Sequence, residues 1–394
     1  MKRARHLLYI ALAAAAALPW LAVRALRAAP AFPLDVLGPG AAIVGAAFLL
    51  TWAAEAAEMD VPQGVAIGLV ALVAVLPEYA VDIFFAWRGG RDPSFIPYAT
   101  ANMTGANRLL IGVAWPAVLA AFWWRSGQRV IRLGLENAVE LATLLGATLF
   151  ACVVFLSGRL TLVDTACFGA LFLFYAWRAA SGEAAEPELE GPAESIGALA
   201  PAARRLATAA LFLFAALVVA ASAGPFALGL IAAGRRWGVE EFLLVQWVAP
   251  LASEAPEFIV AILFALKGKA QVAFRALLSS KVNQWTLLVG CLPAVFALSS
   301  GRPVPMPLDG RQVEEIALTA AQSLFGLAML MDVEFSAGNA AALFVPFAAQ
   351  LLFPTSGARW GFAAAYGAAG ALVLLRRRDR VAAIARRALT LKRV

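Results

Sequence analysis

Long apolar runs, separated by short polar or proline- and glycine-containing breaks, recur from one end of the chain to the other. Each run is about 18 to 28 residues long, and about 20 apolar residues in a helix cross the hydrocarbon core of a bilayer. The pattern predicts an all-α integral membrane protein with about 12 transmembrane helices. The expected helices are 6–26, 36–57, 61–87, 97–122, 134–156, 160–178, 206–234, 239–267, 273–298, 314–332, 337–354 and 359–376.

The composition supports a membrane protein and argues against several other classes. Hydrophobic residues make up 62% of the chain and charged residues 14%, whereas soluble proteins carry about 25% charged residues. The net charge is +7, but the basic residues lie in short clusters between apolar runs and in the tail 376–393. The expected partners are therefore the lipid bilayer and inorganic cations, with no nucleic acid and no obligate protein partner. The three cysteines show no metal-ligand spacing, and no resident cofactor is expected.

The N-terminal run, residues 2–23, resembles a signal peptide in its charge pattern but is long for one and lacks a clean cleavage site, so an uncleaved helix is expected. Loops on alternate sides of the predicted helices differ about twofold in Lys and Arg content. The positive-inside rule then places both termini in the cytoplasm of a cell, or inner, membrane.

An internal repeat relates the two halves of the chain. With a shift of 179 residues, residues 77–89 align with 256–268, and seven of the thirteen positions are identical. Further on, Leu-Leu-Ile-Gly at 109–112 is matched by Leu-Leu-Val-Gly at 287–290. Each copy holds five predicted helices, and an odd number forces the copies into opposite orientations, as in many secondary transporters.

This repeat suggests a division of the chain into five parts. They are an N-terminal extra helix (1–35), a first repeat (36–178), an acidic cytoplasmic linker (179–205), a second repeat (206–354), and a C-terminal helix with a basic tail (355–394).

Glu78 and Glu257 occupy equivalent repeat positions deep within apolar runs, each directly after a proline. A carboxylate there is costly unless it is paired, hydrated, protonated or bound to a cation. A proline also frees a backbone carbonyl, and carbonyl and carboxylate oxygens are ligands for hard cations. The alternatives are that the two acids line a hydrated vestibule, or pair with Arg108 or Lys281.

Amide and hydroxyl side chains follow each Pro-Glu segment. Such neutral oxygens could complete a cation site, although taken alone they more often pack membrane helices together. They are Thr100, Asn102, Thr104 and Asn107 in the first repeat, and Ser279, Ser280, Asn283 and Gln284 in the second.

These motifs resemble the calcium/cation antiporter superfamily of the sodium/calcium exchanger type, over roughly residues 36–354. Its repeats typically carry Gly-Thr-Ser-x-Pro-Glu and then a segment like Gly-Asn-x-x-Gly-Ser-Asn. Here the first motif is Val-Ala-Val-Leu-Pro-Glu at 73–78 and Ala-Ser-Glu-Ala-Pro-Glu at 252–257. The second is Ala-Asn-Met-Thr-Gly-Ala-Asn at 101–107 and, in an ambiguous register, Leu-Ser-Ser-Lys-Val-Asn-Gln at 278–284.

The resemblance implies a secondary antiporter that exchanges Ca²⁺ for Na⁺ or H⁺ by alternating access. Glu78 and Glu257 would be the central calcium ligands. The further candidate metal ligands are Asn102, Thr104, Asn107, Ser253, Glu254, Ser279, Ser280 and Asn283.

Departures from the motif bear on the counter-ion. Residues 73–75 offer no side-chain oxygen for a sodium site, so a proton on a carboxylate could replace sodium. Lys281, if it faces the site, could act as a tethered cation. Glu254 and Asp82, each one turn from a Pro-Glu glutamate, are candidate proton carriers, or they line a hydrated entrance.

Two other functions remain as alternatives, a cation channel with an acidic constriction and a membrane-embedded enzyme. The chain has one histidine, His6, no His-Glu-x-x-His zinc motif and no nucleophile elbow, so enzymatic activity is not expected. Glu314 and Glu315 fall near a predicted helix end, where solvation at the membrane interface would explain them.

Overall fold

The structure, a computed structural model, describes residues 2–60, 75–181 and 189–390. The chain forms two compact units, each assembled from two stretches that are far apart in sequence. Unit 1 comprises Met1–Phe85 and Ala180–Glu257, and unit 2 comprises Ala86–Ala179 and Phe258–Val394.

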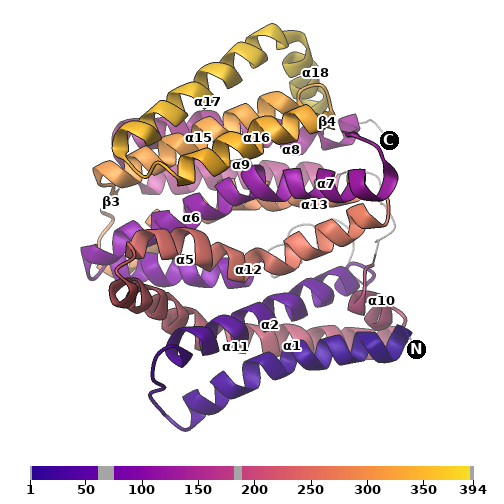
Figure 1. Cartoon of the computed structure of the whole chain (residues 1–394), viewed down its shortest axis with the longest axis vertical. Coiled ribbons are helices and arrows are strands. Elements are labelled where there is room, and N and C mark those ends of the chain that lie inside the picture. The colour runs from indigo at the N-terminus through magenta and orange to yellow at the C-terminus, as the bar shows by residue number, and fades with distance from the viewer. Residues whose placement is uncertain (1, 61–74, 182–188, 391–394) are drawn as a thin grey trace. The chain divides into compact units, whose positions relative to one another are not determined.

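Unit 1 is a bundle in which α1, α2 and α11 lie side by side (Figure 1). Small residues allow these helices to approach closely: a Cβ atom on Gly45 of α2 would lie 2.3 Å from the backbone oxygen of Ala13 on α1. Its helices are α1 (Lys2–Ala25), α2 (Leu34–Ala57), the first part of α5 (Leu76–Gly89), α10 (Pro192–Gly197), α11 (Pro201–Trp237) and most of α12 (Glu241–Leu266).

Part of the predicted solvated linker is folded onto unit 1. Ala193 and Ile196 of α10 are buried in the same apolar cluster as α1 and α2. Arg204, near the end of the predicted linker and already within α11, donates to both carboxylate oxygens of Asp60, at 2.6 and 2.8 Å. The prediction of a solvated linker was wrong for this part, because the acidic residues around Ala193 and Ile196 concealed their apolar character.

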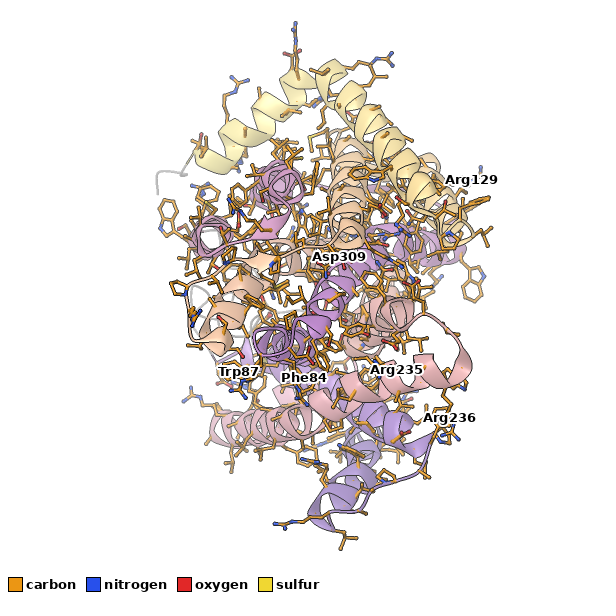
Figure 2. All side chains as sticks on the ribbon, turned by 90° about the vertical axis from the view of Figure 1, so that its left-hand side faces the viewer. Phe84, Trp87, Arg129, Arg235, Arg236 and Asp309 are labelled. Carbon is orange, nitrogen blue, oxygen red and sulfur yellow. The ribbon has the colours of Figure 1, made fainter. Side chains whose placement is uncertain are left out.

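The far end of α11 is fixed by its two arginines, both labelled in Figure 2. Arg235 pairs with Glu241, at the start of α12, at 2.5 Å. The guanidinium of Arg236 lies 4.6 Å from the ring centre of Phe32, a cation–π contact. The end of α11 therefore contacts both the start of α12 and the segment that precedes α2.

In unit 2, two segments that lie far apart in the sequence share one order of elements. In each, a 14-residue α-helix runs into a five-residue π-helical turn and then a 12-residue α-helix that ends at a glycine with positive φ. The first segment is α6 (Ile96–Leu109), η3 (Leu110–Ala114) and α7 (Trp115–Ser126); the second is α13 (Ala270–Asn283), η5 (Gln284–Leu288) and α14 (Val289–Ser300).

The remaining elements of unit 2 pack around these segments, with α15 beside α17 (Figure 1). Asp309, labelled in Figure 2, begins α15 with a capping box to Gln312. The remaining helices of unit 2 are η2 (Pro93–Phe95), η4 (Leu135–Asn137), α8 (Ala138–Ser157), α9 (Leu162–Ala180), α15 (Gly310–Leu330), α16 (Ala337–Leu351), α17 (Ser356–Arg376) and α18 (Arg378–Leu389).

Four short strands, which the apolar pattern did not predict, join the two segments of unit 2. They are β1 (Val130–Arg132), β2 (Arg159–Leu160), β3 (Met306–Pro307) and β4 (Glu334–Ser336). β1 pairs with β4 and β2 with β3, both antiparallel. β1 follows α7 and pairs with β4, which comes after α14 in the chain; β3 follows α14 and pairs with β2, which comes after α7. This reciprocal pairing fits a duplicated unit.

Among the described residues, ten helices are long and apolar enough to cross a membrane, and Ala337–Leu351 is a shorter apolar helix. The all-α membrane class is confirmed. Part of one expected helix, 61–87, lies outside the described residues, and α5 accounts for the rest. The other expected helices match observed ones to within a few residues, because uninterrupted apolar runs define both ends.

Candidate functional site

The acidic candidates all belong to unit 1. Glu78 follows Pro77 in the first turn of α5 as described, where a helix dipole favours a negative charge. Its side chain is buried, as is that of Asp82 one turn later. Both carboxylates are therefore shielded from bulk water within the fold, as predicted for Glu78.

α12 carries the second set of acids, and two prolines interrupt its interior. Glu254 is buried and Glu257 is half-buried. Pro256 cannot donate a backbone hydrogen bond, so the turn before Glu257 keeps a carbonyl group without its usual donor. Ser253, by contrast, directs its hydroxyl to its own helix, 3.2 Å from the backbone oxygen of Ala249.

The amide and hydroxyl candidates of the first repeat lie on α6, in unit 2, and are all fully buried. Thr104 donates to the backbone oxygen of Thr100 at 2.7 Å. Asn107 donates to the backbone oxygen of Met103 at 2.9 Å. Asn102 differs, because within the described part of the chain neither of its amide atoms has a hydrogen-bond partner.

A buried amide that makes no hydrogen bond costs about 1 to 3 kcal/mol. Asn102 is completely inaccessible to solvent, and among the described residues neither its oxygen nor its nitrogen has a partner that would offset this cost. An unsatisfied buried polar group of this kind calls for an explanation, and a bound ligand is one. Among the predicted neutral ligands, Asn102 is the one that the structure distinguishes.

The candidates of the second repeat lie on α13, beside α7 (Figure 1). Ser279 and Ser280 are half-buried and Asn283 is buried. The hydroxyl of Ser279 lies 2.7 Å from that of Tyr175 on α9. Tyr175 was not singled out from the sequence, because a tyrosine in an apolar run carries no distinguishing signal.

Lys281 is buried in unit 2 and is surrounded by oxygen atoms. Its ammonium donates to the side-chain oxygen of Asn107 at 2.7 Å and to the backbone oxygen of the same residue at 3.2 Å. It also donates to Ser323 of α15 at 3.1 Å and lies 4.9 Å from the ring centre of Trp285. The structure thus brings Lys281 and Asn107 together.

Arg108, the other cation considered as a partner for the Pro-Glu glutamates, forms an ion pair with Glu315 of α15. Glu314 pairs with Arg359 at 2.7 Å. Both acids are buried, so interfacial solvation does not explain them. Sequence reasoning also missed Ser323, although Thr319, Gln322 and Ser323 mark one polar face of an otherwise apolar run.

Comparison with known proteins places these features in a family. The sequence profile described as sodium/calcium exchanger protein matches residues 36–180 and 207–356. The chain belongs to the sodium/calcium exchanger family. This membership confirms the superfamily inferred from the two motifs, and the two matched ranges coincide closely with the two predicted repeats.

Solved structures agree with the family assignment. This exchanger is similar to the crystal structure of the H⁺/Ca²⁺ exchanger CAX, with 40% sequence identity, coverage of 98% of both chains and a TM-score of 0.95. It shares its fold with native YfkE at 15% identity, with coverage of 91% of this chain and 99% of that chain and a TM-score of 0.63. It also shares its fold with the sodium-calcium exchanger NCX_Mj at 14% identity, with coverage of 81% of this chain and 97% of that chain and a TM-score of 0.54. No curated protein matches the chain.

Proposed function

We propose that this exchanger is a secondary antiporter that moves Ca²⁺ against H⁺ across the cell membrane, with both termini in the cytoplasm. The observation that carries the proposal is the pair of Pro-Glu carboxylates, Glu78 and Glu257, on two apolar helices that both contribute to unit 1. Two carboxylates neutralise one divalent ion, and Ca²⁺ prefers oxygen ligands.

The chain offers further oxygen ligands of the kind that a hard cation such as Ca²⁺ prefers. The candidate metal ligands beyond the two glutamates are Asn102, Thr104, Asn107, Ser253, Glu254, Ser279, Ser280 and Asn283. Asn102 is the first choice among the neutral ones, because its buried amide oxygen has no partner within the described residues. The hydroxyls of Thr104 and Ser253 each donate to a backbone oxygen of their own helix, and their oxygen lone pairs stay available for a cation.

Two observations favour H⁺ over Na⁺ as the counter-ion. Residues 73–75 carry no side-chain oxygen, which removes neutral ligands that a sodium site would use. The similar protein at 40% identity is described as an H⁺/Ca²⁺ exchanger. We assign Asp82 and Glu254, both buried, as the carboxylates that carry the proton.

The test is uptake of radiolabelled Ca²⁺ into proteoliposomes under an imposed pH gradient or, separately, an imposed Na⁺ gradient. Uptake should follow the pH gradient and disappear when an ionophore dissipates it. Ca²⁺ flux that ignores both gradients would instead identify a channel.

The variant that tests the binding centre is Glu78→Gln combined with Glu257→Gln, which keeps the shape of both side chains and removes both charges. Uptake should fall to background in this double variant. The control is Glu240→Gln, an exposed carboxylate just before α12, which should transport normally. Unchanged transport in the double variant would refute the assignment of the two glutamates.

A further inference from the structure

Lys281 sits where a small monovalent cation could bind. Its ammonium has oxygen atoms from two residues around it, at 2.7 and 3.2 Å from Asn107 and at 3.1 Å from Ser323. The face of Trp285 closes another side, and a hydrogen bond from its ring nitrogen to Thr148, at 3.2 Å, holds the ring in place. Two carbonyl oxygens, a hydroxyl and an aromatic face line this cation-binding cage.

The cage is formed by residues of α6, α15 and η5 and not by one helix. Asn107 and Lys281 are each the third residue before a π-helical segment, η3 or η5. Such segments interrupt regular helix hydrogen bonding and are frequent at functional sites. Here Asn107, at the end of α6 just before η3, accepts from Lys281 with its backbone oxygen as well as its side-chain oxygen.

We infer that the Lys281 ammonium is a tethered cation that occupies a monovalent-cation site and thereby excludes Na⁺ from it. This inference rests on the proposed function and deepens it, because it names a residue that sets the choice of counter-ion. The ammonium is covalently held beside its ligands, so a dissolved ion must compete with a permanent occupant.

Electrostatic repulsion makes that competition one-sided. A second unit charge about 4 Å from the ammonium would bind about a thousandfold more weakly, at the effective dielectric constant that describes protein sites. Removing the ammonium and leaving space behind should therefore open the cage to Na⁺. Removing the charge while filling the space should not.

Two variants separate these effects. Lys281→Ala removes both charge and bulk, whereas Lys281→Met removes the charge and keeps most of the length of the side chain. The matched control is Lys269→Ala, an exposed lysine at the start of the same helix. Each purified protein in detergent is melted in NaCl and in choline chloride at equal ionic strength.

In wild type, Lys269→Ala and Lys281→Met, replacing choline by Na⁺ should leave the melting temperature unchanged. In Lys281→Ala, about 100 mM Na⁺ should raise it by about 2 to 4 °C, as expected for a ligand that binds the folded state. In proteoliposomes, an imposed Na⁺ gradient should alter Ca²⁺ uptake by this variant alone.

A folded Lys281→Ala protein that is indifferent to Na⁺ would overturn the inference. If that variant fails to fold, the wild type provides the test. Saturable stabilisation of the wild type by Na⁺ would overturn the inference, and a melting temperature that does not change with Na⁺ would support it. The melting assay needs no Ca²⁺ transport. A wild type that transports no Ca²⁺ would refute the proposed function and leave the conclusion on Na⁺ binding standing.

Discussion

Arg108 and Glu315 are 207 residues apart in the chain and form an ion pair within unit 2, with side chains only 4% and 3% exposed. The pair joins α6 to α15, one residue after Asn107. Arg311 and Arg359 also lie within 4.0 Å of the Glu315 carboxylate. A charge so deeply buried is tolerated only because its partner is present.

Breaking this pair should therefore be costly. Replacing Arg108 by Met leaves the Glu315 carboxylate buried with less compensation, and we expect a loss of about 3 to 5 kcal/mol of stability. The measurement is thermal unfolding in detergent. The control is Arg132→Met, because Arg132 and Glu334 form an exposed pair at 3.6 Å that should contribute less than about 1 kcal/mol. Equal effects at the two positions would contradict the view that burial governs the cost.

The helical spans and the repeated Pro-Glu helices could be predicted because lipid imposes simple rules on sequence. A spanning segment must be apolar and helical, and a buried acid stands out against it. Glu78 and Glu257 were identified in this way; Glu78 is buried and Glu257 is half-buried. The Pro-Glu motif recurs within an aligned stretch in which seven of thirteen positions are identical, which favours duplication over an accidental match.

What the sequence did not reveal depends on contacts between distant segments. Glu314 and Glu315 were expected to be solvated at a helix end, but arginines from α17 and α6 bury and pair them. The hydrogen bonds from Lys281 to Asn107 and Ser323 join three helices. Partners separated by tens or hundreds of residues leave no local pattern, so only the folded chain shows them.

The ion pair between Asp60 and Arg204 should make stability depend on pH at the acidic end. Hydrogen bonds from Arg204, the largest cause, lower the pKa of Asp60 from its ordinary value of 3.8 to about 2, with a smaller contribution from Arg205. A carboxyl whose pKa is depressed by folding stabilises the protein fully above its unfolded value and loses that contribution as the pH falls through its folded value. The stabilisation should therefore decline between about pH 4 and pH 2.

The measurement is the melting temperature in detergent between pH 6 and pH 2, expressed relative to Asp60→Asn. The wild type should be more stable than Asp60→Asn above about pH 4, and the two curves should converge toward about pH 2. Curves that stay parallel over this range would show that Asp60 does not contribute through its charge.

Two glycines in unit 2 should respond oppositely to the same added methyl group. A Cβ atom on Gly112, within η3, would lie 2.4 Å from Cγ of Phe347 on α16, whereas one on Gly169 of α9 would meet nothing within 4 Å. Gly112→Ala should destabilise by about 1 to 3 kcal/mol because a buried ring must move. Gly169→Ala should stabilise by up to about 1 kcal/mol because alanine favours the helix. Melting temperatures that shift in the same direction would refute the predicted close contact.

Asn102 and Asn107 provide the sharpest separation of stability from function. Asn102 makes no hydrogen bond within the described residues, so replacing it by Leu, which is similar in size, removes a buried polar group that costs about 1 to 3 kcal/mol. We expect Asn102→Leu to melt at a higher temperature without Ca²⁺ and to transport less Ca²⁺. Asn107→Leu removes the ligand of a buried ammonium, at 2.7 Å, and should melt at a lower temperature. If Asn102→Leu proved less stable than wild type and transported Ca²⁺ normally, its amide would be a structural group with partners of its own, and its place among the calcium ligands would be lost.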